Sequence, residues 1–103
     1  MNVITKGTLQ KYMQSFPEAA SWLQTWYEVA EKANWENFNA VKLSYPSADQ
    51  VGDDRVVFNV KGNKFRLIVR FSFRFKVLQI KWFGRHKEYD RIDVLTVQPD
   101  YND

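Results

Sequence analysis

Cysteine is absent from the 103 residues of the sequence, and histidine occurs once. Without thiols the chain can form no disulfide framework, thiolate nucleophile or cysteine-ligated zinc cluster. One histidine cannot supply a histidine-rich metal site either. We therefore expect no bound metal and no cofactor, which excludes several classes of enzyme.

Long apolar runs are also missing. No stretch approaches the roughly 20 apolar residues that a membrane-spanning helix needs. The first ten residues lack the continuous apolar segment of a secretion signal. The sequence therefore predicts a cytoplasmic protein with no membrane partner.

Aromatic residues, by contrast, are abundant: they make up 17% of the chain, and hydrophobic residues make up 45%. Disordered chains carry far fewer. The length allows one compact core but not two ordinary domains. We predict a single domain over residues 1–103, in which the acidic residues 96–103 form a flexible tail.

Positive charge is concentrated in the second half of the chain, although the net charge is only +3. Residues 55–91 contain eleven basic and two acidic side chains, which leaves +9. Residues 1–54 contain four basic and seven acidic ones, and residues 92–103 contain three acidic ones, so each of these segments carries −3. The position of the charge is therefore more informative than its total.

The first half of the chain predicts a short strand followed by helices. Residues 2–4 suit a strand, and Thr5 is placed to cap the next helix. Apolar residues then recur at helical spacing: Leu9, Tyr12, Met13 and Phe16. Pro17 suits the first turn of a second helix, which we predict to end at Ala33. A long connection follows, with one helical turn at 40–43.

Beyond residue 54 the apolar period becomes that of strands. We predict strands at 55–60, 64–75 and 77–82, joined by turns at 61–64 and 74–76. The odd positions of the middle strand are all apolar, and Leu78, Ile80 and Trp82 alternate in the third. The predicted fold class is α+β: a short N-terminal strand and two helices packed on a small twisted, mainly antiparallel sheet, in the order β-α-α-β-β-β with a short C-terminal helical turn.

The other face of this sheet is predicted to be basic. Its charged residues are Lys64, Arg66, Arg70, Arg74 and Lys81. One interpretation is that these cations only keep a solvated face soluble. A solvated face, however, usually mixes in acids, and none occurs between Arg55 and Lys87. The row therefore also suits a polyanion such as nucleic acid, since Arg binds phosphate through its planar fork.

The segment after the last strand contains the single histidine, His86, with Tyr89 and Asp90 close by. These residues could simply form an exposed loop that begins a short helix. Yet metal-free RNA cleavage needs a base, an acid and cations around the phosphate. His86 and Tyr89, one helical turn apart beside the basic face, could supply the proton transfers. A two-metal nuclease would need more carboxylates than Glu88 and Asp90.

In these features the chain resembles the HigB family of toxins, within the RelE/ParE-like group of bacterial toxin–antitoxin systems. The resemblance rests on Val3–Thr5 with Thr8 and Leu9, and on three further segments: Tyr45–Asp49, Val57–Leu67 and Gly84–Asp90. It implies a RelE-like fold and a type II toxin that cuts mRNA on the ribosome without metal and so inhibits translation. It also implies neutralisation by a HigA-type helix-turn-helix antitoxin, through whose complex operator DNA would be contacted only indirectly.

The site implied by the resemblance and the basic face has two parts. The catalytic candidates are His86, Tyr89 and Arg66. The RNA- or phosphate-binding candidates are Lys64, Arg70, Arg74, Lys81, Arg85 and Lys87. Arg85 stands where family members often have threonine, so the identity of the general base stays open. The rival interpretation is a non-catalytic basic module, such as a ParE-like gyrase inhibitor or an RNA-binding domain, which would not need His86 and Tyr89.

Overall fold

The structure is a computed structural model, and it describes residues 1–101. Its helices are α1 (Lys6–Ser15), α2 (Pro17–Lys32), α3 (Phe38–Ser44) and α4 (His86–Tyr89). Its strands are β1 (Asn2–Val3), β2 (Asp49–Gln50), β3 (Arg55–Val60), β4 (Phe65–Ser72) and β5 (Val77–Arg85). They form one sheet in the order β1-β5-β4-β3-β2. Only β1 runs parallel to its neighbour, so the predicted α+β, mainly antiparallel architecture is confirmed.

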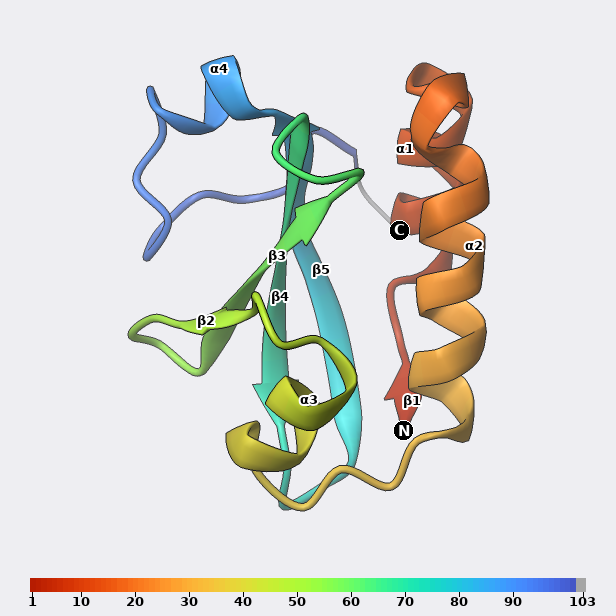
Figure 1. The fold of residues 1–103 in the computed structure, drawn as a ribbon, viewed down its shortest axis with the longest axis vertical. Helices are drawn as coiled ribbons and strands as arrows, with labels where there is room; N and C mark the ends of the chain where they lie inside the picture. The colour runs from red at the N-terminus through yellow and green to blue at the C-terminus, as the bar shows by residue number, and fades with distance from the viewer. Residues whose placement is uncertain (102–103) are drawn as a thin grey trace.

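Helices α1 and α2 cover one face of the sheet (Figure 1). Pro17 begins α2 as predicted, and the helix ends at Lys32, one residue before the expected end. Its buried side chains recur every three or four residues: Ala19, Leu23, Trp26 and Ala30. Trp26 meets Phe58 of β3 edge to face, which joins this stripe to the sheet. None of the helices within residues 1–101 is long and apolar enough to span a membrane.

The segments around these helices differ from the sequence prediction in two places. The Thr5 side chain does not cap α1; its hydroxyl oxygen accepts a hydrogen bond from the backbone N–H of Ile80 at 2.7 Å. The predicted turn at 40–43 is part of the longer helix α3, which Asn37 caps by accepting from Ala40 N–H. Strand β2 escaped prediction because two polar residues have no periodicity of their own.

A β-bulge in β5 changes which side chains face the helices. Ile68 of β4 pairs with Trp82 and Val69 pairs with Ile80, so Lys81 is an extra residue in β5. Ile80 and Phe83 therefore face the helices, whereas Trp82 lies in the cluster on the opposite face. The predicted alternation of Leu78, Ile80 and Trp82 on one face is wrong at Trp82 for this reason. Strand β4 also ends earlier than predicted, at Ser72.

The second face of the sheet carries its own apolar cluster, formed by Val57, Ile68 and Trp82. The residues after β5 pack over it: Tyr89, Ile92, Val94 and Val97. Figure 1 shows this C-terminal segment on the side of the sheet opposite α1 and α2. The prediction that this face is an open, charged surface is therefore wrong at its centre, because the chain itself covers it.

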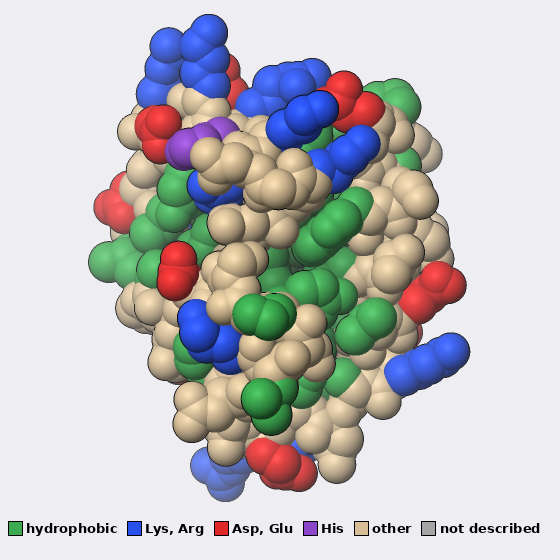
Figure 2. Space-filling view, in the orientation of Figure 1, with side chains coloured by type: hydrophobic (Ala, Val, Ile, Leu, Met, Phe, Trp, Pro, Cys, Tyr) green, Lys and Arg blue, Asp and Glu red, His purple; other side chains and the backbone are tan. Residues whose placement is uncertain are grey.

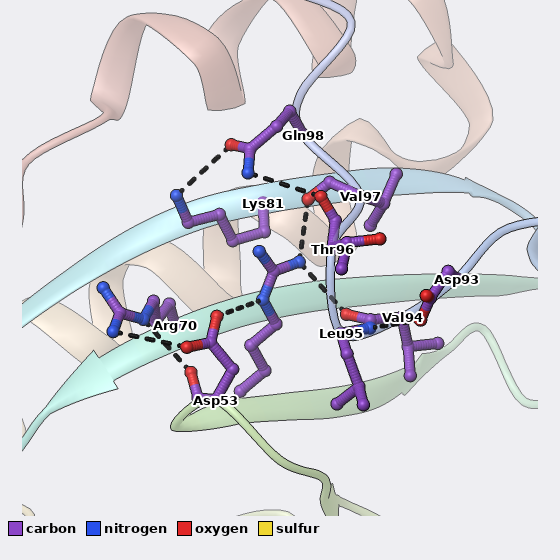
Figure 3. A network of polar contacts seen from close by, with 10 residues as sticks. Asp53, Arg70, Lys81, Asp93, Val94, Leu95, Thr96, Val97 and Gln98 are labelled. Carbon is purple, nitrogen blue, oxygen red and sulfur yellow. Dashed lines mark hydrogen bonds and ion pairs between the residues drawn. The ribbon is translucent and has the colours of Figure 1, made fainter.

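Arg55 holds this C-terminal segment in place through its contacts with Asp53, Val94 and Val97, which are labelled in Figure 3. Its side chain is 2% exposed and pairs with Asp53 at 3.2 Å. One terminal nitrogen donates to the carbonyl oxygens of Val94 at 3.0 Å and Val97 at 2.7 Å. A charge buried this deeply requires such partners. The contact between β3 and residues 94–97 is called the Arg55 clamp below.

The chain beyond the clamp also contacts the body of the protein. The backbone N–H of Asp100 donates to the Tyr12 hydroxyl at 2.9 Å, and the Tyr101 ring meets Tyr12 edge to face at 5.0 Å. These contacts lie within the tail predicted over 96–103, whose flexibility stays a prediction. Residues 102–103 of that tail lie outside the described residues.

Replacing Arg55 with alanine should lower the free energy of unfolding by about 3 kcal/mol, because two part-buried carbonyl oxygens would lose their donor and Asp53 would keep only its ion pair with Arg70. Urea denaturation monitored by Trp fluorescence measures this loss. The control, Arg91→Ala, removes an exposed arginine whose ion pair with Glu88 is 3.9 Å long. It should cost less than about 0.5 kcal/mol. Equal losses in the two variants would contradict the clamp.

Alkaline pH should destabilise the protein through Tyr12. Burial raises the pKa of the Tyr12 phenol well above its usual value. Above about pH 10 the unfolded chain loses this proton while the folded protein keeps it, so stability falls as the pH rises. In urea titrations at about pH 7 and pH 11, Tyr12→Phe should lose less stability between the two than the wild type does. Equal losses would show that Tyr12 does not contribute.

Candidate active site

The end of β5 brings α4 to the hairpin between β3 and β4. The His86 N–H donates to the carbonyl oxygen of Lys64 at 2.9 Å, which ties the start of α4 to the start of β4. Arg66 of β4 lies opposite Gly84 in the register. A Cβ at position 84 would lie 2.5 Å from the Trp82 ring, which is too close for a real contact. Glycine at this position therefore makes room for the Trp82 ring. The hairpin, β5 and α4 thus meet at one end of the sheet.

Tyr89 is the centre of the side-chain cluster at this end. Its ring lies 6.4 Å from Trp82 and 6.4 Å from His86 between centroids. The Arg66 guanidinium lies over the Tyr89 ring, with its carbon 5.7 Å from the centroid. The three catalytic candidates of the sequence, Arg66, His86 and Tyr89, are therefore brought together.

Hydrogen bonds orient Arg66 within this cluster. One terminal nitrogen donates to Asn63 Oδ1 at 2.6 Å, and the other donates to the carbonyl oxygen of Phe65 at 3.1 Å. Both acceptors are neutral. The guanidinium keeps its positive charge and further N–H donors for an anion.

His86 and Asp90 form the outer edge of the cluster. His86 Nε2 lies 3.4 Å from Asp90 Oδ1, one helical turn away, and the His86 side chain is 38% exposed. A hydrogen on Nε2 pointing at this carboxylate leaves Nδ1 free to accept a proton. Figure 2 shows the histidine at the α4 end of the molecule, with Lys and Arg side chains nearby.

The surroundings of Tyr89 raise the pKa of its phenol, which like that of an ordinary tyrosine is protonated at neutral pH. Burial is the largest cause of its raised pKa, and the carboxylates of Asp49 and Asp90 raise the pKa further. The positive charge of Arg66 acts in the opposite sense and lowers it. A protonated phenol beside a cation can donate a hydrogen bond or a proton to an oxygen that becomes negative.

The predicted phosphate-binding residues are divided among several places. Lys64 and Lys87 flank the cluster and are exposed, with no ion pair to any described residue. Arg85 instead points to the helix side, where it pairs with Glu18 at 3.6 Å and lies over the Phe16 and Phe65 rings. Arg74 is in the turn at the other end of β4, over the Phe75 ring.

Arg70 and Lys81 form a second basic group beside the Arg55 clamp (Figure 3). Arg70 pairs with Asp53 at 3.5 Å, and Lys81 Nζ lies 3.5 Å from the Gln98 side-chain oxygen. Burial lowers the pKa of Lys81, and the charges of Arg55 and Arg70 lower it further, against the opposing effect of Asp53. The C-terminal segment packs on Ile68 and Trp82, which form an apolar cluster on the same face of the sheet. The predicted continuous basic wall is therefore interrupted.

Sequence reasoning missed two residues that shape the site, Asn63 and Trp82. Asn63 had been assigned only to a turn, and Trp82 only to the core. An asparagine in a turn three residues before Arg66 offers no signal for a side-chain contact, because the contact depends on the turn's backbone angles. Within residues 1–101, no three His, Asp or Glu side chains gather as a candidate metal site.

The mixed five-stranded sheet, with a basic and aromatic cluster at one end, is the α+β architecture expected of a RelE-like toxin domain. Residues 19–92 match the HigB toxin family, the RelE-like toxic component of a toxin–antitoxin system. The chain therefore belongs to the HigB toxin family.

Curated relatives agree with this assignment. The chain is 28% identical over 92 residues to the mRNA interferase toxin HigB of Escherichia coli strain K12. The alignment covers 87% of this chain and 88% of the relative. The mRNA interferase HigB of Shigella flexneri matches with the same identity and coverage.

Removing the charge of Arg66 should raise the pKa of Tyr89 further, because Arg66 stabilises the phenolate. Carbon-13 NMR of labelled tyrosine rings, titrated in the wild type and in Arg66→Ala, measures the change. Arg74→Ala removes an equal charge at the far end of β4 and should leave the Tyr89 titration in place. A Tyr89 pKa that is unchanged or lower in Arg66→Ala would show that the two side chains do not interact in this way.

Proposed function

We propose that this chain is a type II toxin that acts as an mRNA endoribonuclease, cutting translated messages on the ribosome without a metal ion. The observation that carries the proposal is the packing of Arg66 and His86 around the protonated Tyr89. Two exposed lysines, Lys64 and Lys87, flank the three residues. The names of the HigB relatives support an mRNA substrate.

In the proposed reaction the 2′-hydroxyl oxygen attacks the neighbouring phosphorus. His86 accepts the hydroxyl proton at Nδ1, and Asp90 stabilises the imidazolium that results. The bond from phosphorus to the 5′-oxygen breaks, and Tyr89 donates its proton to that oxygen. The products are a 2′,3′-cyclic phosphate, which can open to a 3′-phosphate, and a 5′-hydroxyl. The roles of His86 and Tyr89 can be exchanged without altering this balance.

Arg66 supplies the charge that the reaction needs. Negative charge accumulates on the phosphate oxygens in the transition state, and a fixed guanidinium stabilises it more there than in the ground state. Lys64 and Lys87 bind the flanking phosphates as flexible point charges. Arg70 and Lys81 bind RNA beyond the C-terminal segment, whereas Arg74 and Arg85 lie away from the cluster.

The partner and the site of action that we propose follow from the HigB toxin family. A toxic component needs a neutralising partner, and we propose a HigA-type helix-turn-helix antitoxin whose complex with the toxin contacts operator DNA. Messages on ribosomes place the proposed site of action in the cytoplasm.

Induction of the wild-type protein should arrest growth and create new 5′-hydroxyl ends in cellular mRNA. Arg66→Ala, His86→Ala and Tyr89→Phe should each lower the cleavage rate by about 100-fold or more. Lys32→Ala, which removes one positive charge at the far end of α2, is the control and should cleave like the wild type. Sequencing of 5′ ends, with purified ribosomes added or omitted in vitro, measures these rates.

Two outcomes would contradict the proposal. Intact transcripts at a growth-arresting dose would exclude the nuclease. Growth arrest that needs Arg66 but survives His86→Ala and Tyr89→Phe would instead identify a non-catalytic basic module.

A further inference from the structure

Asn63 occupies a turn whose shape aims its side chain at Arg66. The turn begins with Lys61 and Gly62, both in the left-handed backbone region with φ of 52° and 69°. Asn63 follows, and its Oδ1 lies 2.6 Å from a terminal nitrogen of Arg66. A guanidinium can only donate hydrogen bonds, so the amide oxygen must be the acceptor. Asn63 is not one of the catalytic candidates, yet it contacts Arg66 at the centre of the candidate active site.

Four of the other five arginines are held in a different way, whereas the fifth, Arg74, lies over the Phe75 ring in the turn after β4. Each of four arginines pairs with a carboxylate: Arg55 and Arg70 with Asp53, Arg85 with Glu18, and Arg91 with Glu88. Arg66 has no carboxylate partner in the part of the chain that the structure describes. Its contacts are the Asn63 amide, the Phe65 carbonyl and the Tyr89 ring, all neutral. Arg66 is thus fixed in position without being neutralised.

We propose that Asn63 is a positioning residue, which holds Arg66 over Tyr89 through a neutral amide so that the guanidinium keeps its full charge for the scissile phosphate. This inference rests on the proposed RNA cleavage. The proposal depends on the neutral charge of the Asn63 amide. Aspartate at this position would accept the same hydrogen bond from nearly the same place. It would also form an ion pair with Arg66 and compete with the phosphate.

Two substitutions separate orientation from charge. Asn63→Ala removes the acceptor and leaves the Arg66 charge intact, whereas Asn63→Asp keeps the acceptor and cancels the charge. Asn39→Asp is the matched control, because Asn39 is an exposed residue of α3 and the change alters the net charge equally. Circular dichroism and urea denaturation verify that each variant folds.

Cleavage of a message on purified ribosomes gives kcat and KM. Asn63→Ala should lower kcat by about 10- to 100-fold, since a misplaced group loses the geometry of the transition state. Asn63→Asp should lower it at least as much. Asn39→Asp should stay within about twofold of the wild type, as exposed substitutions away from a site usually do.

Binding of a 2′-O-methyl RNA, which lacks the attacking hydroxyl, gives the second readout. The logarithm of the binding constant falls with the logarithm of salt concentration by about 0.7 for each phosphate contact on a single strand. In Asn63→Asp this slope should become shallower by about 0.7, which corresponds to the loss of one phosphate contact. In Asn63→Ala the slope should equal that of the wild type.

Wild-type kcat in both Asn63 variants would overturn the proposal, as would equal salt slopes in both. If the wild-type protein cleaves no RNA, the proposed function fails by itself. The difference in salt slope between Asn63→Asp and Asn63→Ala then still decides whether Asn63 protects the charge of Arg66.

Discussion

The buried guanidinium of Arg55 is the contact on which the placement of the C-terminal segment after α4 depends. By binding Asp53 and two carbonyl oxygens of residues 94–97, it fastens the end of the chain across the second face of the sheet. The apolar cluster around Trp82 is buried as a result, and Tyr89 packs on that cluster. Since Tyr89 packs on this cluster, the covering C-terminal segment helps to fix the candidate active site at one end of the sheet.

Pairing with acids determines what each cation of the basic segment can do. Arg55 serves stability, Arg85 packs against α2, and Arg70 shares Asp53 with the clamp. Arg66 and the two flanking lysines keep their charge for an anion. A segment that looks uniformly basic in sequence therefore contains two kinds of cation: those that Asp53 and Glu18 neutralise, and those without a carboxylate partner among the described residues.

Much of the fold and part of the site could be predicted from local pattern. The stripe of α2 and the odd positions of β4 from Phe65 to Phe71 face the core as their periodicity indicates. The cluster of His86, Tyr89 and Arg66 was found through the family resemblance and the chemistry of RNA cleavage. The bulge at Lys81 could not be predicted, since one inserted residue leaves the composition of a strand unchanged yet reverses the faces beyond it.

The sequence by itself determined the α+β class, the helix and strand periods, and a basic segment followed by His86 and Tyr89. Those features depend on neighbours within a few residues, where spacing translates directly into geometry. Tertiary structure alone decided which cations are neutralised and that the outer face is covered. These outcomes depend on contacts such as Arg55 with Val97 and Arg85 with Glu18, whose partners lie dozens of residues apart and are brought together only by the packed core.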